Sequence, residues 1–494
     1  MTILARLKRF ALPKPSFAFL RIELLAGLLV ALSMIPTSIA FSIVVGVDPS
    51  VGLFASAVMA CSIAAFGGRP AMVSIATAAM ALILAPLGHT YGAGYVMAAT
   101  IAAGVVQILL ATTGVTKLMR YIPRSVFTGF TNALAILIFL SQMPYLIGQP
   151  WPVWALAAAA LGIIVLFPYL TKVIPAPLVA IVVLTTVTVV FTVSVPTVGS
   201  MGNLPDGLPW VALPDVPFTL DTVRIIAPYA VGLAIVGLLE SLMAAGLVDD
   251  MTDTESNKTR EAAGQGAGNI MVGIFGGFAS CAAIGQTVMN VKSGARSRLS
   301  TFSAGIFLLI LVVALGDVVG HIPMAVLVAI MVFVAAITFD WHSVRPSTLK
   351  RLPISETVTM ASTVVATVTT HNLAIGVGVG VIVAMIIFAR KAAKVVNVTS
   401  VTDPDGCTEF YAVSGELFFA STNQLIESFD YQCAAETVIV DLTEAHVWDA
   451  SAVAALDAVT DKYRRRGKDV DIIGFNAPSK QLHDNLSTRP RQDA

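Results

Sequence analysis

The chain has 494 residues, of which 56% are hydrophobic and only 12% are charged. Ordinary soluble domains carry about 25% charged residues, so this composition excludes a soluble enzyme and a disordered protein. So much apolar surface needs lipid as its solvent, which predicts a protein that lies in a bilayer. The 30 basic residues balance the 30 acidic ones, so the net charge gives no reason to expect a nucleic-acid partner.

This balance hides two parts of opposite charge. Residues 1–397 carry 22 basic and 14 acidic side chains, whereas residues 398–494 carry 8 basic and 16 acidic ones. We therefore expect a short cytoplasmic segment at 1–21, a membrane domain at 22–396 and a separate domain at 398–494. The four cysteines have no paired spacing, so the sequence predicts no disulfide framework, no metal site and no cofactor.

Apolar runs of about 20 residues, long enough to cross a bilayer as helices, recur along the membrane part. Two shorter runs, 73–87 and 285–292, are too brief to span alone and predict broken crossings. With both included, the sequence predicts fourteen segments, at 22–46, 50–66, 73–87, 94–116, 125–147, 152–170, 175–195, 225–248, 266–282, 285–292, 301–317, 323–339, 354–370 and 372–390.

Lysine and arginine are distributed unevenly among the connections between these segments. Because basic residues concentrate on the cytoplasmic side of a membrane, the connections that hold them are expected to be the inner ones. Arg224 is the single exception in the membrane part. This distribution predicts a multi-pass protein of the cell inner membrane with both termini in the cytoplasm. The basic residues of the inner connections are Arg69, Lys117, Arg120, Arg124, Lys172, Lys258, Arg260, Lys292, Arg296, Arg298, Arg345, Lys350, Arg351, Arg390, Lys391 and Lys394.

A loop rich in proline and glycine, at 196–221, separates seven segments from seven. A repeated unit with an odd number of crossings must be inverted relative to its copy, so we expect inverted repeats at about 22–195 and 225–396. Inverted repeats are typical of secondary transporters, whose substrate binds near the midplane where the copies meet. The short runs fall at the third position of each half, where broken helices are expected. The alternative is that they are re-entrant packing elements without a ligand.

Two half-helices starting near 74–77 and 285–287 would present unpaired N–H groups and positive dipole ends inside the membrane. Such ends form an anion site even without a basic side chain. The small residues beside them let a ligand approach the backbone. Gln286 either donates to an anion or caps the second half-helix, and the sequence leaves both readings open. The candidate substrate-binding residues at these ends are Ala76, Thr77, Gly285, Gln286 and Thr287.

Glu240 lies deep inside the apolar segment 225–248. An ionised group there is costly, and such residues commonly mark the path of an ion or a proton. Glu240 is therefore a candidate proton-coupling residue that takes up and releases a proton during transport. The alternative is a permanently protonated side chain bonded to a neighbouring carbonyl. Phe41, which follows the break at Pro36, either walls a cavity or packs within the membrane.

Residues 398–494 have the pattern of a small α/β domain, in which apolar strands alternate with helices. The chain has no phosphate-binding GxxxxGK[ST] motif and no nucleophile–base pair, so neither ATP-driven pumping nor an enzymatic activity is predicted. Energy for transport is expected to come from an ion gradient. The elements predicted in this part are strands at 409–421, 436–445 and 468–475, a helix at 450–467 and a last helix around 479–485.

Four stretches are specific enough to compare with known families: LESLMAAGLVDDMTDTESNKTREAAGQGAGNI (239–270), IPTSIAFS (35–42), NVKSGARSRLS (290–300) and WDASAVAALD (448–457). Together they resemble the SulP/SLC26 anion transporter family, which is sulfate permease-like, over nearly the whole chain. In this resemblance Glu240 is the acidic residue of the eighth span. Thr37 and Phe41 fall on cavity-lining, substrate-binding positions of the first span, and the tail is a STAS domain.

The resemblance implies a multi-span α-helical membrane protein with 14 segments in a 7+7 inverted repeat. Segments 1–4 and 8–11 would form an UraA/SLC26-like core domain, and segments 5–7 and 12–14 the gate domain. The small α/β STAS domain would lie in the cytoplasm, and a homodimer in the lipid bilayer is expected.

Two departures from the family pattern concern the mechanism. The family often has Ser-Arg at the start of the tenth span, where this chain has Gly285 and Gln286, so a fixed positive charge on the substrate is missing. Sodium-coupled members have a threonine one turn after the acidic residue, where this chain has Ala244, which favours proton coupling. We therefore predict a proton symporter of sulfate, bicarbonate or a dicarboxylate that works by alternating access. The alternatives are a sodium-coupled bicarbonate importer, a non-transporting anion sensor and an uncoupled anion channel.

Overall fold

The computed structural model describes residues 17–114, 123–170, 175–201, 210–314, 316–393 and 396–487. The chain divides into two compact units, Met1–Val381 and Ile382–Ala494. By length and composition, seven of the described helices can cross a membrane, and four further apolar helices are shorter. Four basic residues used to predict the topology lie outside the described residues: Lys117, Arg120, Lys172 and Lys394.

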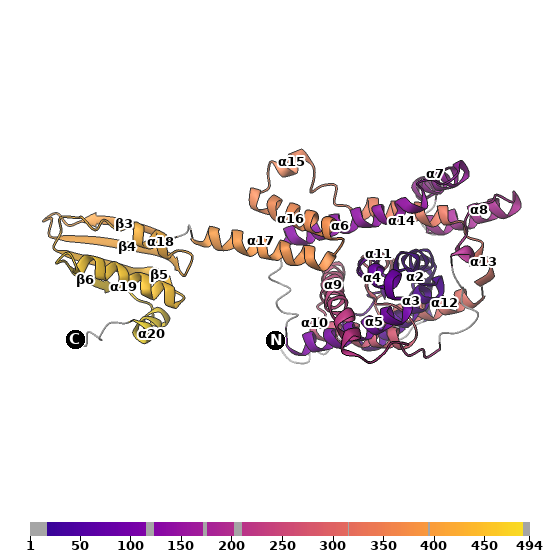
Figure 1. Cartoon of the computed structure of the whole chain (residues 1–494), viewed down its shortest axis with the longest axis horizontal. Helices are drawn as coiled ribbons and strands as arrows, with labels where there is room; N and C mark the ends of the chain where they lie inside the picture. The colour runs from indigo at the N-terminus through magenta and orange to yellow at the C-terminus, as the bar shows by residue number, and fades with distance from the viewer. Residues whose placement is uncertain are drawn as a thin grey trace. The chain divides into compact units, whose positions relative to one another are not determined.

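The first half of the membrane unit follows the predicted segments in chain order (Figure 1). Its third crossing is broken into a short strand and a helix. Several of its helices begin at or directly after a proline, which cannot donate to a preceding turn and suits a helix start. The elements are α2 (Phe17–Val45), α3 (Pro49–Phe66), β1 (Ser74–Ile75), α4 (Ala78–Tyr91), α5 (Ala93–Thr112), α6 (Arg124–Gln142), α7 (Trp151–Leu166) and α8 (Ala176–Val190).

The second half repeats this order, again with a broken third crossing. When each strand–helix pair counts as one crossing, the described residues hold fourteen crossings, seven in each half, as the sequence predicts. The short helices α13 (Gly316–Gly320) and α15 (Pro346–Leu349) lie in connections. The main elements are α9 (Leu220–Thr252), α10 (Lys258–Ile274), β2 (Cys281–Ala282), α11 (Ile284–Lys292), α12 (Arg298–Ala314), α14 (Met324–Thr338), α16 (Ile354–Thr370) and α17 (Leu373–Ala393).

One segment was misplaced by the apolar pattern. The run 266–282 predicts a single span, but α10 begins eight residues earlier, at Lys258, and ends at Ile274, and residues 281–282 form β2. The first turn of α10 is polar, and its Glu261 side chain is buried, where the carboxylate accepts hydrogen bonds from the backbone N–H groups of Gly68 and Arg69, at 2.7 and 2.9 Å. A buried polar group satisfied in this way costs little, so hydropathy alone does not find the helix start.

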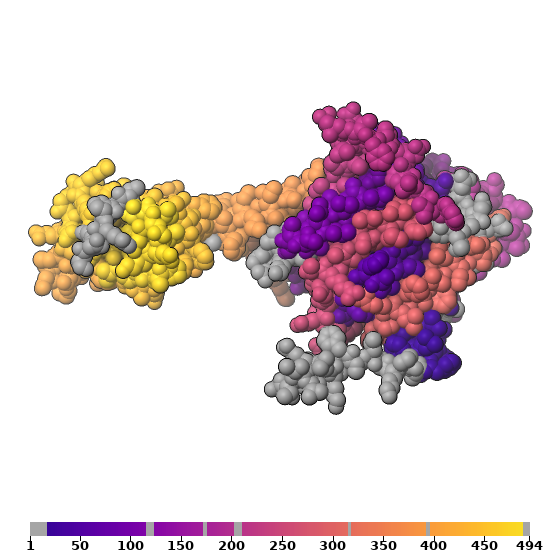
Figure 2. All heavy atoms as spheres, turned by 90° about the horizontal axis from the view of Figure 1, so that it is seen from below, coloured from indigo at the N-terminus to yellow at the C-terminus, as the bar shows by residue number. Residues whose placement is uncertain are grey.

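The two halves of the membrane unit are interleaved. Helix α10 packs along α5 and α3, and α12 packs along α2 and α3. Figure 2 shows the same interleaving on one face, where indigo and purple surfaces of the first half lie between pink and salmon surfaces of the second. Helices α14 and α16 instead pack against α6, and α14 also contacts α7. The contacts therefore define a core group, α2–α5 with α9–α12, and a gate group around α6, α7, α14 and α16.

Glycines allow the closest of these contacts, between α5 and α10. A Cβ atom built on Gly104 would lie 2.5 Å from the carbonyl oxygen of Gly266, and one built on Gly266 would lie 2.6 Å from that of Gly104. Small residues let membrane helices approach so that their backbones are in van der Waals contact, which drives helix association in lipid. The glycine-rich sequence of α10 is therefore a packing requirement.

We expect Gly266→Leu to destabilise the membrane unit by about 3 kcal/mol, since the added atoms overlap backbone that has no freedom to move aside. The readout is the temperature at which detergent-purified protein loses its monodisperse gel-filtration peak. Gly162→Leu on α7 is the matched control, because a Cβ there meets nothing within 4 Å. Equal thermal profiles for the two variants would contradict the packing role.

The second unit contains a four-stranded sheet in the order β3-β4-β5-β6. Strands β3 and β4 are antiparallel, and β4–β5 and β5–β6 are parallel. The buried side chains of Val438, Val440 and Leu442 on β5 pack with Val453 and Leu456 of the covering helix. The predicted strands and helices are all present, while β3 and α18 were not predicted. The elements are β3 (Asn397–Thr402), β4 (Thr408–Leu417), α18 (Thr422–Glu427), β5 (Thr437–Val447), α19 (Ala450–Arg464), β6 (Asp469–Ile473) and α20 (Ala477–Leu486).

Asp449 joins two elements of this unit. Its Oδ1 accepts from the N–H of Ala452 at 2.9 Å and caps α19, and its Oδ2 accepts from the N–H of Phe419 at 2.8 Å, just after β4. We expect Asp449→Ala to lower the free energy of unfolding of this unit by about 1–2 kcal/mol, the usual value of an N-cap. Urea unfolding of residues 396–487 would measure it. The exposed neighbour Ser451, changed to alanine, should shift the value by less than about 0.5 kcal/mol.

Candidate functional site

The two broken crossings meet in a short antiparallel ladder. Ser74 of β1 pairs with Ala282 of β2, and Ile75 pairs with Cys281. A helix starts at once after each strand, with Thr77 as the N-cap of α4 and Ala283 as the N-cap of α11, and neither side chain caps its helix. The predicted broken crossings are therefore present, and the ladder brings two helix N-termini to one place. Their first N–H groups and dipoles favour a negative charge.

Helix α10 holds this ladder from behind. The Gln265 amide donates to Ser74 Oγ at 2.7 Å. The Asn269 side chain donates to the carbonyl oxygen of Ser280 at 3.1 Å and accepts from its N–H at 2.8 Å. On the other side the N–H of Ala282 donates to Ser241 Oγ of α9 at 3.2 Å. These supports were not predicted from the sequence, although polar residues four apart (261, 265 and 269) in a glycine-rich span were a signal for them.

A cavity of about 540 Å³ lies at the junction of the two helix N-termini, with walls from α2, α4, α6, α9, α11 and α14. Among the described residues that line it, Glu240 is the only charged one, and no Lys, Arg or His is present. The pair Gly285 and Gln286 stands where the resembling family often has Ser-Arg, so no arginine was expected at this position. The predicted site residues found in the lining are Thr37, Phe41, Ala76, Thr77, Glu240, Gly285 and Gln286.

Thr287 takes a different place from the one predicted. It is fully buried, and its hydroxyl accepts from the N–H of Val73 at 3.0 Å and donates to the carbonyl of Val73 at 3.2 Å. Since its one hydroxyl serves two backbone groups, Thr287 ties α11 to the start of β1 and does not line the cavity. Gln286 lines the cavity, and no side-chain hydrogen bond caps the start of α11 among the described residues.

Glu240 is buried on α9, and its Oε2 accepts from two groups. The Cys281 thiol lies 2.8 Å away and the Thr77 hydroxyl 3.5 Å away. The thiol and the hydroxyl are themselves 3.0 Å apart. Cys281 was not a candidate from the sequence, because a lone cysteine in an apolar run carries no pattern. Glu240 therefore lies at the wall of the cavity with neutral donors around it, where a carboxyl group can take up or release a proton.

In the described part of the membrane unit, two other carboxylates are buried, and both already accept several hydrogen bonds. Glu23 accepts from the N–H groups of Arg296, Ser297 and Ser300, at 2.8, 3.1 and 3.1 Å, and so caps the start of α12. Glu261 accepts from the backbone N–H groups of Gly68 and Arg69, which precede β1. Both serve backbone N–H groups that would otherwise be unpaired. Neither lines the cavity, so Glu240 is the carboxylate placed to act on a solute there.

A second hollow, of about 580 Å³, adjoins the first between α6 and α9. Thr131 and Met243 line both spaces. Arg124, Asp250 and Asp340 add three charged side chains to the second one. The cavity thus continues toward the end of the membrane unit where the predicted inner connections lie.

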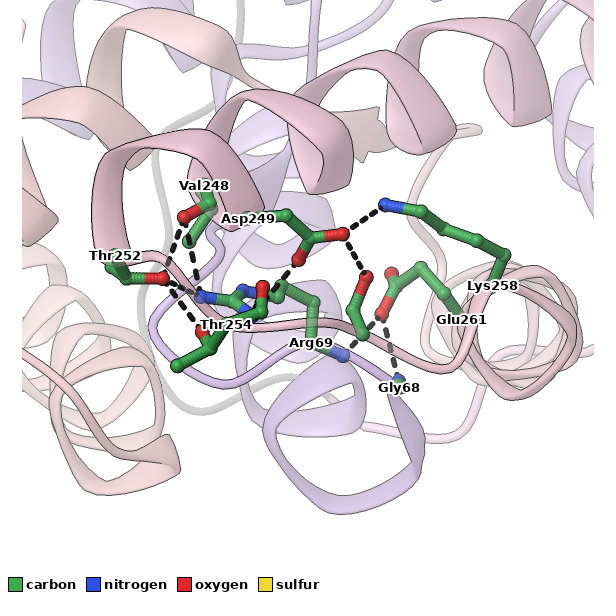
Figure 3. Close-up of polar contacts among 9 residues, drawn as sticks. Gly68, Arg69, Val248, Asp249, Thr252, Thr254, Lys258 and Glu261 are labelled. Carbon is green, nitrogen blue, oxygen red and sulfur yellow. Dashed lines mark hydrogen bonds and ion pairs between the residues drawn. The ribbon is translucent and has the colours of Figure 1, made fainter. Parts of the chain in front are cut away.

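Figure 3 shows a polar cluster around Arg69 that fixes the C-terminal end of α9. The nearly buried guanidinium forms an ion pair with Asp249 at 2.9 Å and donates to the Val248 carbonyl and to the Thr252 and Thr254 side chains. Asp249 also pairs with Lys258 at 2.7 Å. These contacts therefore hold the end of α9 against the loop before β1 and the start of α10.

A membrane unit in which two broken helices meet at a cavity is typical of a membrane transporter. The chain belongs to the sulfate permease family: the family model matches residues 20–155 and 148–363, and a STAS domain model matches residues 400–488.

Three relatives illustrate the match. YbaR of Bacillus subtilis (strain 168), named as an inferred sulfate transporter, is 48% identical over 96% of this chain and 98% of its own. The solved transmembrane domain of a cyanobacterial bicarbonate transporter, BicA, is 26% identical with a TM-score of 0.65, over 73% of this chain and 98% of that one. The murine Slc26a9 anion transporter in its inward-facing state has the same fold, with a TM-score of 0.82 at 16% identity, over 98% of this chain and 89% of that one.

Proposed function

We propose that this protein is a secondary active anion transporter that carries a proton with its substrate. The anion binds between the N-termini of α4 and α11, and Glu240 carries the proton. One observation carries the proposal: a cavity at two opposed helix starts whose described lining has a single charged group, the Glu240 carboxyl. Backbone N–H groups supply the attraction for the anion, and the carboxyl must lose its charge before an anion approaches closely.

The surroundings of Glu240 favour a proton over sodium as the coupling ion. Sodium is a hard cation that requires several oxygen ligands, like other hard cations. Glu240 is contacted by a thiol and one hydroxyl, and one turn later the buried Ala244 offers no oxygen. A proton needs only the carboxyl itself.

Sulfate is the first substrate to test, because the YbaR relative is named for sulfate. Bicarbonate is the second, because BicA relatives are named for bicarbonate. A cavity of about 540 Å³ falls in the usual size range of small-molecule sites, so a C4-dicarboxylate belongs in the same panel.

Transport is proposed to occur by alternating access, in which the core group moves against the gate group. The hollow between α6 and α9 is the inner exit of the cavity, on the side of the basic connections. This orientation places both termini and the STAS domain in the cytoplasm, and the protein works as a homodimer in the cell inner membrane.

The test is uptake of radiolabelled sulfate into proteoliposomes that hold the full chain, with an imposed inward proton gradient and no sodium. Accumulation that a protonophore abolishes is the expected result. Uptake that needs sodium would make the protein a sodium-coupled importer, and uptake that ignores both gradients would make it a channel. Binding of sulfate without any uptake would make it a sensor. Bicarbonate and dicarboxylates compete in parallel assays to rank the substrate.

A further inference from the structure

Three side chains from three separate segments meet at one point beside the cavity. Glu240 comes from α9, Cys281 from β2 and Thr77 from the start of α4. The Cys281 thiol is fully buried, 2.8 Å from Glu240 Oε2 and 3.0 Å from Thr77 Oγ1. The Thr77 hydroxyl is 3.5 Å from the same Glu240 oxygen. The thiol therefore bridges the carboxyl group and the helix start that faces the cavity.

Only two protons are available for hydrogen bonds among Cys281, Thr77 and an ionised Glu240. An ionised carboxylate only accepts hydrogen bonds, while a thiol and a hydroxyl each carry a single proton to donate. When Glu240 is ionised, its Oε2 holds the Cys281 proton at 2.8 Å, and the Thr77 proton is directed at the Cys281 sulfur at 3.0 Å or at the same Oε2 at 3.5 Å. When Glu240 is protonated, its oxygen accepts more weakly and the Thr77 proton becomes available to another acceptor. Thr77 lines the cavity, so that acceptor is a bound anion.

We propose that Cys281 is a positioning residue that links Glu240 to Thr77, so that protonation of Glu240 turns the Thr77 hydroxyl toward the anion. The one bond exchange is a proton transfer: hydronium in the cavity loses an O–H bond, the Glu240 carboxylate gains one, and the Thr77 hydroxyl rotates. The inference rests on the proposed function and adds to it the physical link between proton and anion. Linkage is reciprocal, so the anion also strengthens proton binding.

In the described cavity lining no other charged side chain competes for this role, while Arg124, Asp250 and Asp340 line the adjoining hollow. The groups that face Glu240 are Cys281 from β2 and Thr77 from α4, and the described cavity lining contains no second charged residue from α2, α6, α11 or α14. The polar residues of α10 are occupied with the ladder itself, through Gln265 and Asn269. The part of the pH dependence of sulfate affinity that variants of Cys281 or Thr77 remove therefore reports on this triangle.

Sulfate binding to the full chain in nanodiscs, measured at mildly acidic and mildly alkaline pH, tests the link. Sulfate remains a dianion throughout this range, so any pH dependence belongs to the protein. We expect wild-type affinity to be about tenfold higher at the acidic pH. Thr77→Val and Cys281→Ala should clearly reduce this ratio, to the part that repulsion between ionised Glu240 and the anion supplies alone. Thr77→Ser and Cys281→Ser should restore it, because each keeps a single donor at the same place.

Cys61→Ala in α3 and Thr100→Val in α5 are matched controls outside the cavity, and both should keep the tenfold ratio. A folded Cys281→Ala protein that keeps the full ratio, or a Cys281→Ser protein that loses it, overturns the proposal. If Cys281→Ala does not fold, a Thr77→Val protein with an unchanged ratio overturns it equally. Failure of the proposed function looks different: wild-type liposomes would not accumulate sulfate on a proton gradient, although the binding ratio remains.

Discussion

Replacement of Glu240 by glutamine is expected to abolish accumulation of sulfate on a proton gradient, with a loss of at least about tenfold. Glutamine has the same shape and its Oε1 still accepts from Cys281 and Thr77, so the cavity wall is preserved. What it lacks is the ability to bind and release a proton. Exchange of labelled for unlabelled sulfate needs no net proton movement and should persist. The measurement is gradient-driven uptake and exchange in the same proteoliposomes.

Glu356→Gln provides the control for this experiment, because Glu356 is an exposed carboxylate in the first turn of α16, outside the cavity lining. Its accumulation should equal that of the wild type. Undiminished accumulation by the Glu240→Gln protein would remove Glu240 from the coupling mechanism and leave the anion site without an identified proton carrier. Loss of both accumulation and exchange would instead assign Glu240 to substrate binding.

Replacement of Arg69 by methionine is expected to cost about 3 kcal/mol or more of stability in the membrane unit, as for other broken buried ion pairs. The side chain holds Asp249, the Val248 carbonyl and two threonine hydroxyls at or just beyond the C-terminal end of α9 (Figure 3). Methionine fills part of the volume and supplies no donor. The temperature of half-loss of monodisperse protein should fall by about 5 °C or more.

Arg224, which is exposed, serves as the control for the buried Arg69. Arg224 pairs with Asp221 at 3.4 Å, but both side chains are largely exposed, at 71% and 83% of their full area. Exposed pairs contribute about 0–1 kcal/mol, so Arg224→Met should leave the thermal profile nearly unchanged. An equal effect of the two substitutions would show that the Arg69 cluster does not fix α9.

Most of the architecture was predictable because the reasons for it are local. A lipid-spanning helix needs a run of about 20 apolar residues, and the shorter run 285–292 marks α11 as a half-crossing. The apolar residues of β5 similarly predict a strand, and its buried side chains pack against α19. The prediction failed for α10, where the helix start is polar and Glu261 is satisfied by backbone from a distant loop. Hydropathy cannot register a partner far away in the chain.

The candidate site was predictable only in part, for the same reason. The positions of Thr77, Gln286 and Glu240 follow from broken runs and one buried acid, and all three line the cavity. Thr287 was assigned to the lining because it is small and adjacent, yet its hydroxyl is used by Val73. Cys281 could not be chosen, because its significance lies in a contact with Glu240, 41 residues earlier in the chain.

The sequence by itself determined how many times the chain crosses the membrane, that the two halves correspond and that a separate α/β domain follows. These are matters of solvation, set by the transfer of each residue between water and lipid. Only the tertiary structure decided which polar atoms meet inside the membrane unit. The Thr77–Glu240 contact joins residues 163 apart, and the Arg69–Thr254 contact joins residues 185 apart. Hydrogen bonds act over about 3 Å, so their partners are defined only after the helices have packed.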